Sequence, residues 1–255
     1  MWKLFPFNNY FLNADRTYSF SEQWDLVIET GYDQFYLSVN LNNEDSWQNL
    51  LKIPQERRRT GLGLAAVYTV VDFSSLYDPK NTKGHHPEEI LDVLEPGDTF
   101  ELALSFGWQK DMSDPRHDDA AIEFLRALLK KAKTRNVTLS LYHHLGFWQE
   151  RIEDCVRIAE KVNDPSLRVS FCGYHWYACD GKDLEAKLDL AKPWLHLVNL
   201  SGSRPAKGFA NSLSATVEVV GDGDFPLHEL IRYLRRIGYE GSIGFQGYML
   251  GGYPP

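Results

Sequence analysis

Histidines follow two neighbouring strand-like runs near the middle of the chain. His143 and His144 come just after the apolar run Val137–Leu141, with Tyr142 between, and His175 follows the run Leu167–Phe171. A helical pattern separates the runs, so the segment predicts a strand, a helix and a second strand. Such a unit makes its two strands parallel, and their carboxyl ends then open on the same side of the sheet. We therefore expect the three imidazoles near one face, where parallel α/β folds carry their chemistry.

The adjacent imidazoles are candidates for acid–base chemistry, because a histidine titrates near neutral pH. Successive side chains along a strand point to opposite faces, so only one of His143 and His144 is expected to face the interior. We favour His144 for that place, and we predict that His144 and His175 are the catalytic residues. The alternative for His175 is a core histidine that is bound to a backbone carbonyl.

The other predicted strand ends carry neutral amides and large aromatic side chains, with few charges. Aromatic faces pack against the C–H faces of sugar rings, while amides and imidazoles form hydrogen bonds with hydroxyl groups. This mixture predicts a sugar or keto-sugar as the ligand. The candidate substrate-binding residues are Asp72, Trp108, His143, Trp148, Trp176, Asn199, Arg204 and Gln246, with Asn8, Asn9 and Asn40 at further strand ends. Asp72 is the only carboxylate among them.

Several of these residues have a second interpretation. Cys172 lies three residues before His175, a spacing that a nucleophilic pair could use, but we favour a small packed thiol because free cysteines are so often buried. Trp148 and Trp176 are predicted to form a wall for a sugar ring; the alternative is packing between helices and strands. Gln246 needs a hydrogen-bond partner if it is buried, and a side chain of a neighbouring strand could provide it as well as a ligand.

Eight strand-like runs alternate with seven helical patterns along the chain. This alternation predicts a single (β/α)₈ TIM barrel domain over residues 1–255 that lacks its last helix. An open doubly wound sheet is the alternative, but no glycine-rich phosphate loop follows the first strand. Pro54 is predicted to kink or divide its helix, and residues 201–225 are predicted to form a long loop. The strands are expected at residues 3–8, 34–39, 62–73, 99–106, 137–141, 167–171, 195–200 and 242–248.

Composition narrows the class of protein further. The chain has 255 residues, of which 43% are hydrophobic, and a net charge of −8. A negative chain is a poor partner for the phosphates of nucleic acid, which require a basic face. No run approaches the roughly 20 apolar residues of a membrane span. The three cysteines follow no disulfide spacing, so we expect reduced thiols and a cytoplasmic location.

The chain resembles the xylose isomerase-like TIM barrels, a family of sugar phosphate isomerases and epimerases. The resemblance covers nearly the whole chain and is clearest in LSLYHHLGFWQERIEDCVRIAEKVNDPSLRVSFCGYHW, LHLVNLSGS and GDGDFPLHELIRYLRRIGYEGSIGFQGY. It implies a substrate-side histidine at His175 and places Arg204 near a substrate-binding arginine of the family. Metal-dependent members hold a divalent ion with a Glu, an Asp, a His and a Glu after strands five to eight, and the two Glu residues move the proton.

All four of these metal-binding positions differ in this chain. They fall at Tyr142 or His143, at Cys172, at Asn199 and at Gln246. A hard divalent cation prefers charged oxygen ligands, so we predict weak metal binding or none, and no other cofactor. Zinc on His144, Cys172 and His175 is the alternative, but a fourth ligand is missing.

The leading hypothesis is a sugar or sugar phosphate isomerase or epimerase that transfers a proton beside a carbonyl group. The second is a catalytically silent barrel that binds a sugar or a partner protein, which the missing carboxylates favour. The third is a metal-dependent lyase or hydrolase acting on keto-sugars. The predicted absence of the last helix leaves apolar surface that either the amino-terminal residues or a second copy of the chain could cover, so a homo-oligomer is among the expectations.

Overall fold

The computed structural model describes residues 1–255 except 14–15, 77–83, 206–214, 249 and 251–255. Its centre is a sheet of eight parallel strands with the order β1-β10-β7-β6-β5-β4-β3-β2. The strands are β1 (Leu4–Pro6), β2 (Gln34–Val39), β3 (Gly63–Asp72), β4 (Thr99–Ser105), β5 (Thr138–Tyr142), β6 (Leu167–Cys172), β7 (Leu195–Leu200) and β10 (Ile243–Phe245).

The sheet curls into a nearly closed barrel. In the described residues β1 and β2 form no strand ladder, yet two hydrogen bonds join their ends. The amide of Asp33 donates to the carbonyl of Leu4 at 2.9 Å, and the amide of Ser38 donates to Oδ1 of Asn8 at 2.8 Å. The predicted α/β barrel is thereby confirmed.

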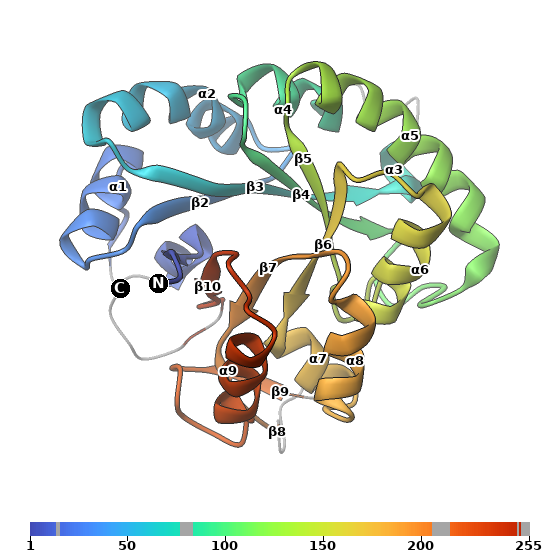
Figure 1. Ribbon diagram of the computed structural model, residues 1–255. Coiled ribbons are helices and arrows are strands. Elements are labelled where there is room, and N and C mark those ends of the chain that lie inside the picture. Colours follow the sequence, from blue (N-terminus) through green and yellow to red (C-terminus); the bar gives the residue numbers. More distant parts are fainter. Residues whose placement is uncertain (14–15, 77–83, 206–214, 249, 251–255) are drawn as a thin grey trace.

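Helices surround the strands on the outside, as Figure 1 shows. No helix follows β10 in the described part of the chain, and none of the described helices is long and apolar enough to cross a membrane. The large helices are α1 (Phe20–Glu29), α2 (Glu44–Thr60), α4 (Pro87–Val93), α5 (Asp118–Thr134), α6 (Ile152–Val162), α8 (Leu184–Ala191) and α9 (Leu227–Arg236). Shorter ones are η1 (Asn8–Asn13), α3 (Phe73–Leu76), η2 (Pro115–His117) and α7 (Gly173–Cys179).

Helix α2 runs without interruption through Pro54, so the predicted division of this helix is wrong. The side chain of Asn43 caps its first turn by accepting from the amide of Ser46 at 2.8 Å. Gly61 ends the helix with a φ of 72°, a left-handed conformation that glycine adopts without strain. Leu50 and Ile53 before the proline and Glu56 after it are buried, and they hold the helix on the barrel despite the lost backbone hydrogen bond.

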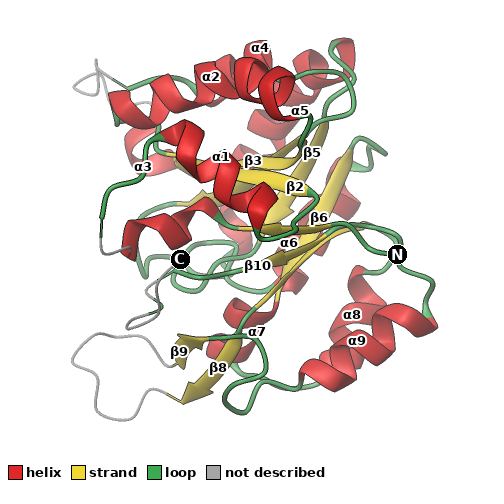
Figure 2. Cartoon of the chain, turned by 90° about the vertical axis from the view of Figure 1, so that its left-hand side faces the viewer, coloured by secondary structure: helices red, strands yellow, loops and turns green. Residues whose placement is uncertain are grey.

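The segment over residues 201–225 contains more structure than the predicted loop. Strands β8 (Gly202–Pro205) and β9 (Ala215–Glu218) pair antiparallel, and Figure 2 shows them beside α7, apart from the barrel strands. The sequence also gave no indication that α7 begins directly after β6. A side chain at Gly173 would meet the ring of Phe225 at 2.6 Å, so the close packing of α7 requires glycine there.

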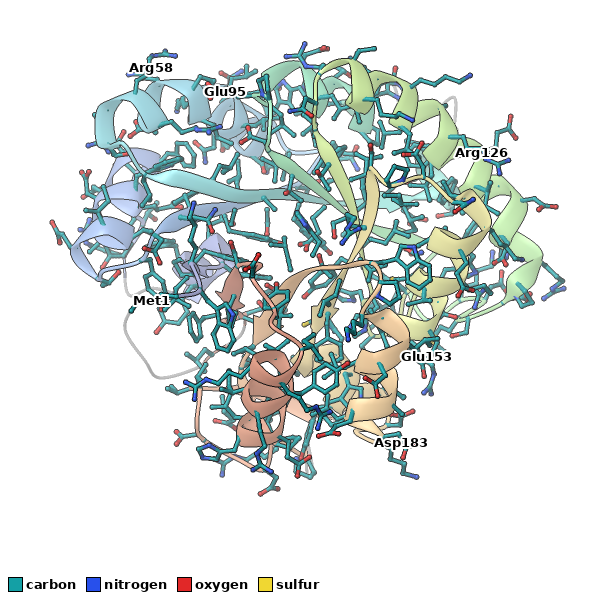
Figure 3. All side chains as sticks on the ribbon, in the orientation of Figure 1. Met1, Arg58, Glu95, Arg126, Glu153 and Asp183 are labelled. Carbon is teal, nitrogen blue, oxygen red and sulfur yellow. The ribbon has the colours of Figure 1, made fainter. Side chains whose placement is uncertain are left out.

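Two layers of buried side chains result from this arrangement. The outer layer joins strands to helices and contains most of the core. The inner layer fills the barrel with Phe5, Phe7, Tyr36, Tyr142 and their neighbours. Figure 3 shows side chains filling the space that the strands enclose, whereas the labelled Arg58 and Arg126 point outward from the helices. The carboxyl ends of the strands therefore form the open end above a packed core.

Candidate active site

His144 and His175 lie against each other at the carboxyl ends of β5 and β6. Their ring centroids are 4.0 Å apart, although 31 positions separate them in the sequence. His144 is the second residue after β5. His175 was predicted at the end of a strand but lies in the first turn of α7. The ring of Phe147 stacks on His144 at 4.0 Å and holds it in place.

The backbone of Leu145 binds both imidazoles and gives them opposite roles. Nδ1 of His144 lies 2.8 Å from the carbonyl oxygen of Leu145, so this nitrogen carries the proton and Nε2 has a free lone pair. Nδ1 of His175 accepts from the amide of Leu145 at 3.2 Å, so its proton is on Nε2. That Nε2 is buried and has no hydrogen-bond partner in the described structure. One ring thus offers an acceptor and the other a donor.

Burial keeps both rings neutral. It lowers the pKa of His144 to about 4, although the hydrogen bond to Leu145 acts in the opposite direction. It lowers the pKa of His175 well below the usual range, with smaller contributions from the neighbouring His144 and His143. Neutral imidazoles at neutral pH can accept a proton or donate a hydrogen bond without first losing a charge.

His143 has a different environment from its neighbour. It is fully buried, its Nε2 accepts from the amide of Cys172 at 2.9 Å, and its Nδ1 is 3.4 Å from the carbonyl oxygen of Glu150. Burial lowers its pKa to about 3. Both ring nitrogens therefore bind backbone, and His143 connects the end of β5 to the end of β6 without reaching a ligand.

Trp148 and Trp176 do not form the predicted wall for a sugar ring. Trp148 is fully buried and donates to the carbonyl of Asp114 at 2.7 Å, and Trp176 is 4% exposed and donates to the carbonyl of Lys182 at 3.0 Å. Both rings pack between strands and helices, so neither is open to a sugar. Trp108, in contrast, is 50% exposed, and its ring centroid is 6.5 Å from that of His144.

Two amides lie at the ends of the next strands. Asn199, at the end of β7, is fully buried, and neither its Oδ1 nor its Nδ2 has a partner among the described residues. Gln246, just after β10, is 8% exposed, and its Oε1 accepts from Nδ2 of Asn9 at 3.1 Å. Asn199 can therefore bind a ligand with both atoms, whereas Gln246 has a partner at the end of β1.

Asp72 and Arg204 are the two charged residues of the predicted set, and each has a local partner. Oδ1 of Asp72 accepts from the amide and the hydroxyl of Ser74, at 3.0 and 2.8 Å. Nε of Arg204 is 3.0 Å from Oε1 of Glu218 within the pair of strands β8 and β9, and its side chain is 52% exposed. The geometry does not bring Arg204 to the imidazole pair.

The residues at the four metal-binding positions do not fit a divalent ion. Burial raises the pKa of the Tyr142 hydroxyl well above its usual value and that of the Cys172 thiol to about 11, so neither is an anion at neutral pH. Asn199 and Gln246 add only neutral amides. No group of three or more His, Cys, Asp and Glu side chains in the described ranges is arranged to hold a metal, which also leaves the zinc alternative without support.

A buried carboxylate that the sequence analysis missed lies inside the barrel. Glu101 in β4 is fully buried, its Oε2 accepts from the hydroxyl of Tyr36, and its Oε1 has no hydrogen-bond partner in the described part of the chain. Burial raises its pKa to about 7, while the hydroxyls of Ser170 and Tyr36 act in the opposite direction. The alternation in TFELALS, whose Phe100 and Leu102 face the helices, was the signal that could have found it.

A cavity of about 1110 Å³ opens over the ends of β1, β2 and β3. Asn8, Asn9, Asn40 and Asp72 line it at the strand ends, together with Tyr68. The ring of Tyr68 is 5.2 Å from that of Tyr142, which in turn is 5.4 Å from His175. Two ring contacts, from Tyr68 to Tyr142 and from Tyr142 to His175, thus connect the lining of the cavity to the catalytic candidates.

Comparison with known proteins identifies the family of the chain and structures with the same fold. The sequence model of the xylose isomerase-like TIM barrel family matches residues 93–248, more than half of the chain. No curated protein sequence matches the chain. Among solved structures, 3-keto-D-glucoside 4-epimerase from E. coli superposes with a TM-score of 0.73 at 18% identity, over 100% of this chain and 95% of that one.

Two further structures show the same fold. D-psicose 3-epimerase from Clostridium cellulolyticum H10, solved with D-tagatose, has a TM-score of 0.71 at 16% identity, over 96% of this chain and 84% of that one. The IOLI protein, solved with a zinc atom, has a TM-score of 0.74 at 13% identity, over 96% of this chain and 89% of that one. At these identities the similarity establishes the fold and not the reaction.

Proposed function

The chain belongs to the xylose isomerase-like TIM barrel family, and from this premise we propose that it is a carbohydrate isomerase or epimerase in which His144 carries the proton and His175 stabilises the enolate. The substrate class is a sugar or keto-sugar, since imidazoles, a free amide and an exposed aromatic ring meet at one end of the barrel. The distant fold similarity to sugar epimerases supports the same class of reaction.

The observation that carries the proposal is the opposite protonation of the two rings, 4.0 Å apart. Nε2 of His144 accepts the proton from a carbon beside a carbonyl group, and the C–H electrons form the double bond of an enolate. Nε2–H of His175 donates a hydrogen bond to the enolate oxygen, which stabilises the charge that develops there. The imidazolium of His144 then returns the proton to carbon, so the enzyme ends unchanged.

The direction of the returning proton decides between the two reactions. A single acceptor returns the proton on the face from which it came. If the hydroxyl of the α-carbon first passes its proton to the adjacent enolate oxygen, and the proton on His144 then returns to the former carbonyl carbon, the α-carbon becomes the new carbonyl and the result is aldose–ketose isomerisation. Epimerisation requires a second group on the opposite face of the sugar. The amide of Asn199, whose two polar atoms lack protein partners, would bind and orient a hydroxyl in either case. Trp108 would pack its exposed ring on the C–H face of the sugar.

A catalytically silent sugar-binding barrel is the second candidate. The observation that favours it is the pair of amides, Asn199 and Gln246, at positions where metal-dependent members carry a histidine and a glutamate. Neither amide accepts a proton at neutral pH, so an ordinary second base is missing. This candidate predicts sugar binding without any exchange of hydrogen at carbon.

Hydrogen exchange at carbon distinguishes the two candidates. The protein is incubated in deuterated water with a panel of aldoses, ketoses and keto-glycosides, and proton NMR follows the loss of C–H signals. Turnover is expected with at least one sugar, and His175→Gln should slow it by about 100-fold or more, the usual contribution of a positioned acid or base. His228→Gln, an exposed histidine of α9, is the matched control. Full activity in His175→Gln would refute the assigned roles, and binding without exchange would favour the silent barrel.

A further inference from the structure

The cavity over the ends of β1, β2 and β3 is larger than the space a single sugar ring requires. We propose that it binds a second, uncharged sugar unit, so that the substrate is a glycoside or disaccharide and not a free monosaccharide. This inference rests on the proposed function, which places the reacting unit at His144 and His175. The cavity measures about 1110 Å³, slightly above the roughly 300–1,000 Å³ that pockets for drug-sized ligands span.

The position of the cavity suits an extended ligand. Tyr68 lines it and contacts Tyr142 at a ring distance of 5.2 Å, and Tyr142 contacts His175 at 5.4 Å. A ligand with one unit at the imidazoles and one in the cavity would span this pair of tyrosine rings. Asn9, which lines the cavity, also donates to Gln246 just after β10 at 3.1 Å.

Two buried oxygen atoms in the cavity residues lack donors. Oδ1 of Asn9 and Oε1 of Gln23 have no hydrogen-bond partner among the described residues. Both amides are held by their nitrogens, since Asn9 donates to Gln246 at 3.1 Å and Gln23 donates to the carbonyl of Tyr18 at 3.3 Å. These hydrogen bonds fix the orientation of both amides and leave their oxygens without a donor. A buried carbonyl oxygen without a donor is unfavourable, and the hydroxyl groups of a sugar are donors of the right kind.

The charges around the cavity favour a neutral ligand over a phosphorylated one. Arg16 lines the cavity, but its guanidinium is 3.0 Å from Oε1 of Glu22 and lies 3.9 Å from the ring centroid of Tyr18. Asp45 and Asp72 line the same space and would repel an anion. The described part of the lining thus offers aromatic faces, amides and two carboxylates, and its arginine is paired with Glu22, so a phosphate group would meet no unpaired guanidinium there.

The experiment compares matched sugars by calorimetric titration. The pairs are cellobiose with D-glucose and lactulose with D-fructose, and D-fructose 6-phosphate tests the charge. At least one disaccharide is expected to bind about 10-fold or more tightly than its matched monosaccharide and more tightly than the phosphate ester. Gln23→Leu removes the free acceptor and should reduce the disaccharide-to-monosaccharide affinity ratio by about 5-fold, the value of one neutral hydrogen bond. Gln48→Leu, an exposed glutamine of α2, is the matched control and should not change the ratio.

Every outcome of the titration either supports or overturns the second sugar site. Equal affinities within both pairs, tighter binding of the phosphate ester, no binding at all, or an unchanged ratio in Gln23→Leu would overturn the second sugar site. Gln23→Met lacks the same acceptor and replaces the leucine variant if that one does not fold. A disaccharide preference without hydrogen exchange at carbon would leave the second site standing and overturn the proposed reaction, so the two failures are distinguishable.

Discussion

Replacing Glu101 with glutamine should change how the stability of the protein depends on pH. The carboxyl group lies inside the barrel with no cation bound to it, and burial raises its pKa from 4.5 to about 7. The folded protein therefore holds this proton more tightly than the unfolded chain does. Between about pH 4.5 and pH 7 the folded state carries the extra proton, so the free energy of unfolding decreases as the pH rises through this range.

The size of the effect follows from the two pKa values of Glu101. Their difference corresponds to about 3 kcal/mol of stability that is present below pH 4.5 and lost above pH 7. Glutamine cannot ionise, so the variant lacks this loss. The stability of the variant relative to the natural protein should thus rise by about 3 kcal/mol between pH 4 and pH 8. The other titrating groups cancel in this difference, because both proteins contain them.

Urea unfolding at several pH values, followed by tryptophan fluorescence, measures the difference for Glu101→Gln. Tyr36→Phe is the informative second variant, because the Tyr36 hydroxyl donates to the carboxylate and lowers its pKa. Its removal should raise the pKa of Glu101 further and move the loss of stability to higher pH. A stability difference between Glu101→Gln and the natural protein that stays constant from pH 4 to pH 8 would refute the reasoning.

Two further predictions concern an ion pair and a metal. Asp118→Asn should lower the free energy of unfolding by about 3 kcal/mol, because this buried carboxylate is 3.1 Å from Nε of Arg157 and 2.6 Å from Nζ of Lys161. Asp119→Asn, at an exposed position of the same helix, is the control. Urea unfolding that shows a loss of less than about 1 kcal/mol for Asp118→Asn would contradict the prediction. Dialysis of untagged protein against EDTA should change neither the melting temperature nor any sugar turnover, since the four metal-binding positions offer no charged ligand. Activity that is lost on dialysis and restored by Mn²⁺ would overturn that conclusion.

The local pattern of the sequence was enough to predict the barrel. Apolar runs of strand length alternate with amphipathic helices, and the spacing of apolar residues in each segment predicts whether it forms a strand or a helix. Strands β2 and β7 begin and end at the predicted positions, 34–39 and 195–200. The pattern failed where tertiary contacts decided the structure. Phe225 packs against Gly173 and allows α7 to begin directly after β6, and the pairing of β8 with β9 joins residues that carry no strong strand signal.

The candidate site, too, was predictable from the sequence only in part. The sequence alone determined that histidines, amides and aromatics gather at the carboxyl ends of the strands, because parallel strands end on one side. It could not determine which nitrogen of His144 or His175 carries the proton, since the backbone of Leu145 decides that only once both rings lie beside it. Nor could it tell that Trp148 is enclosed by helices while Trp108 stays open. Periodicity records whether a side chain is buried, but its partner comes from a distant part of the chain, and only the folded structure brings the two together.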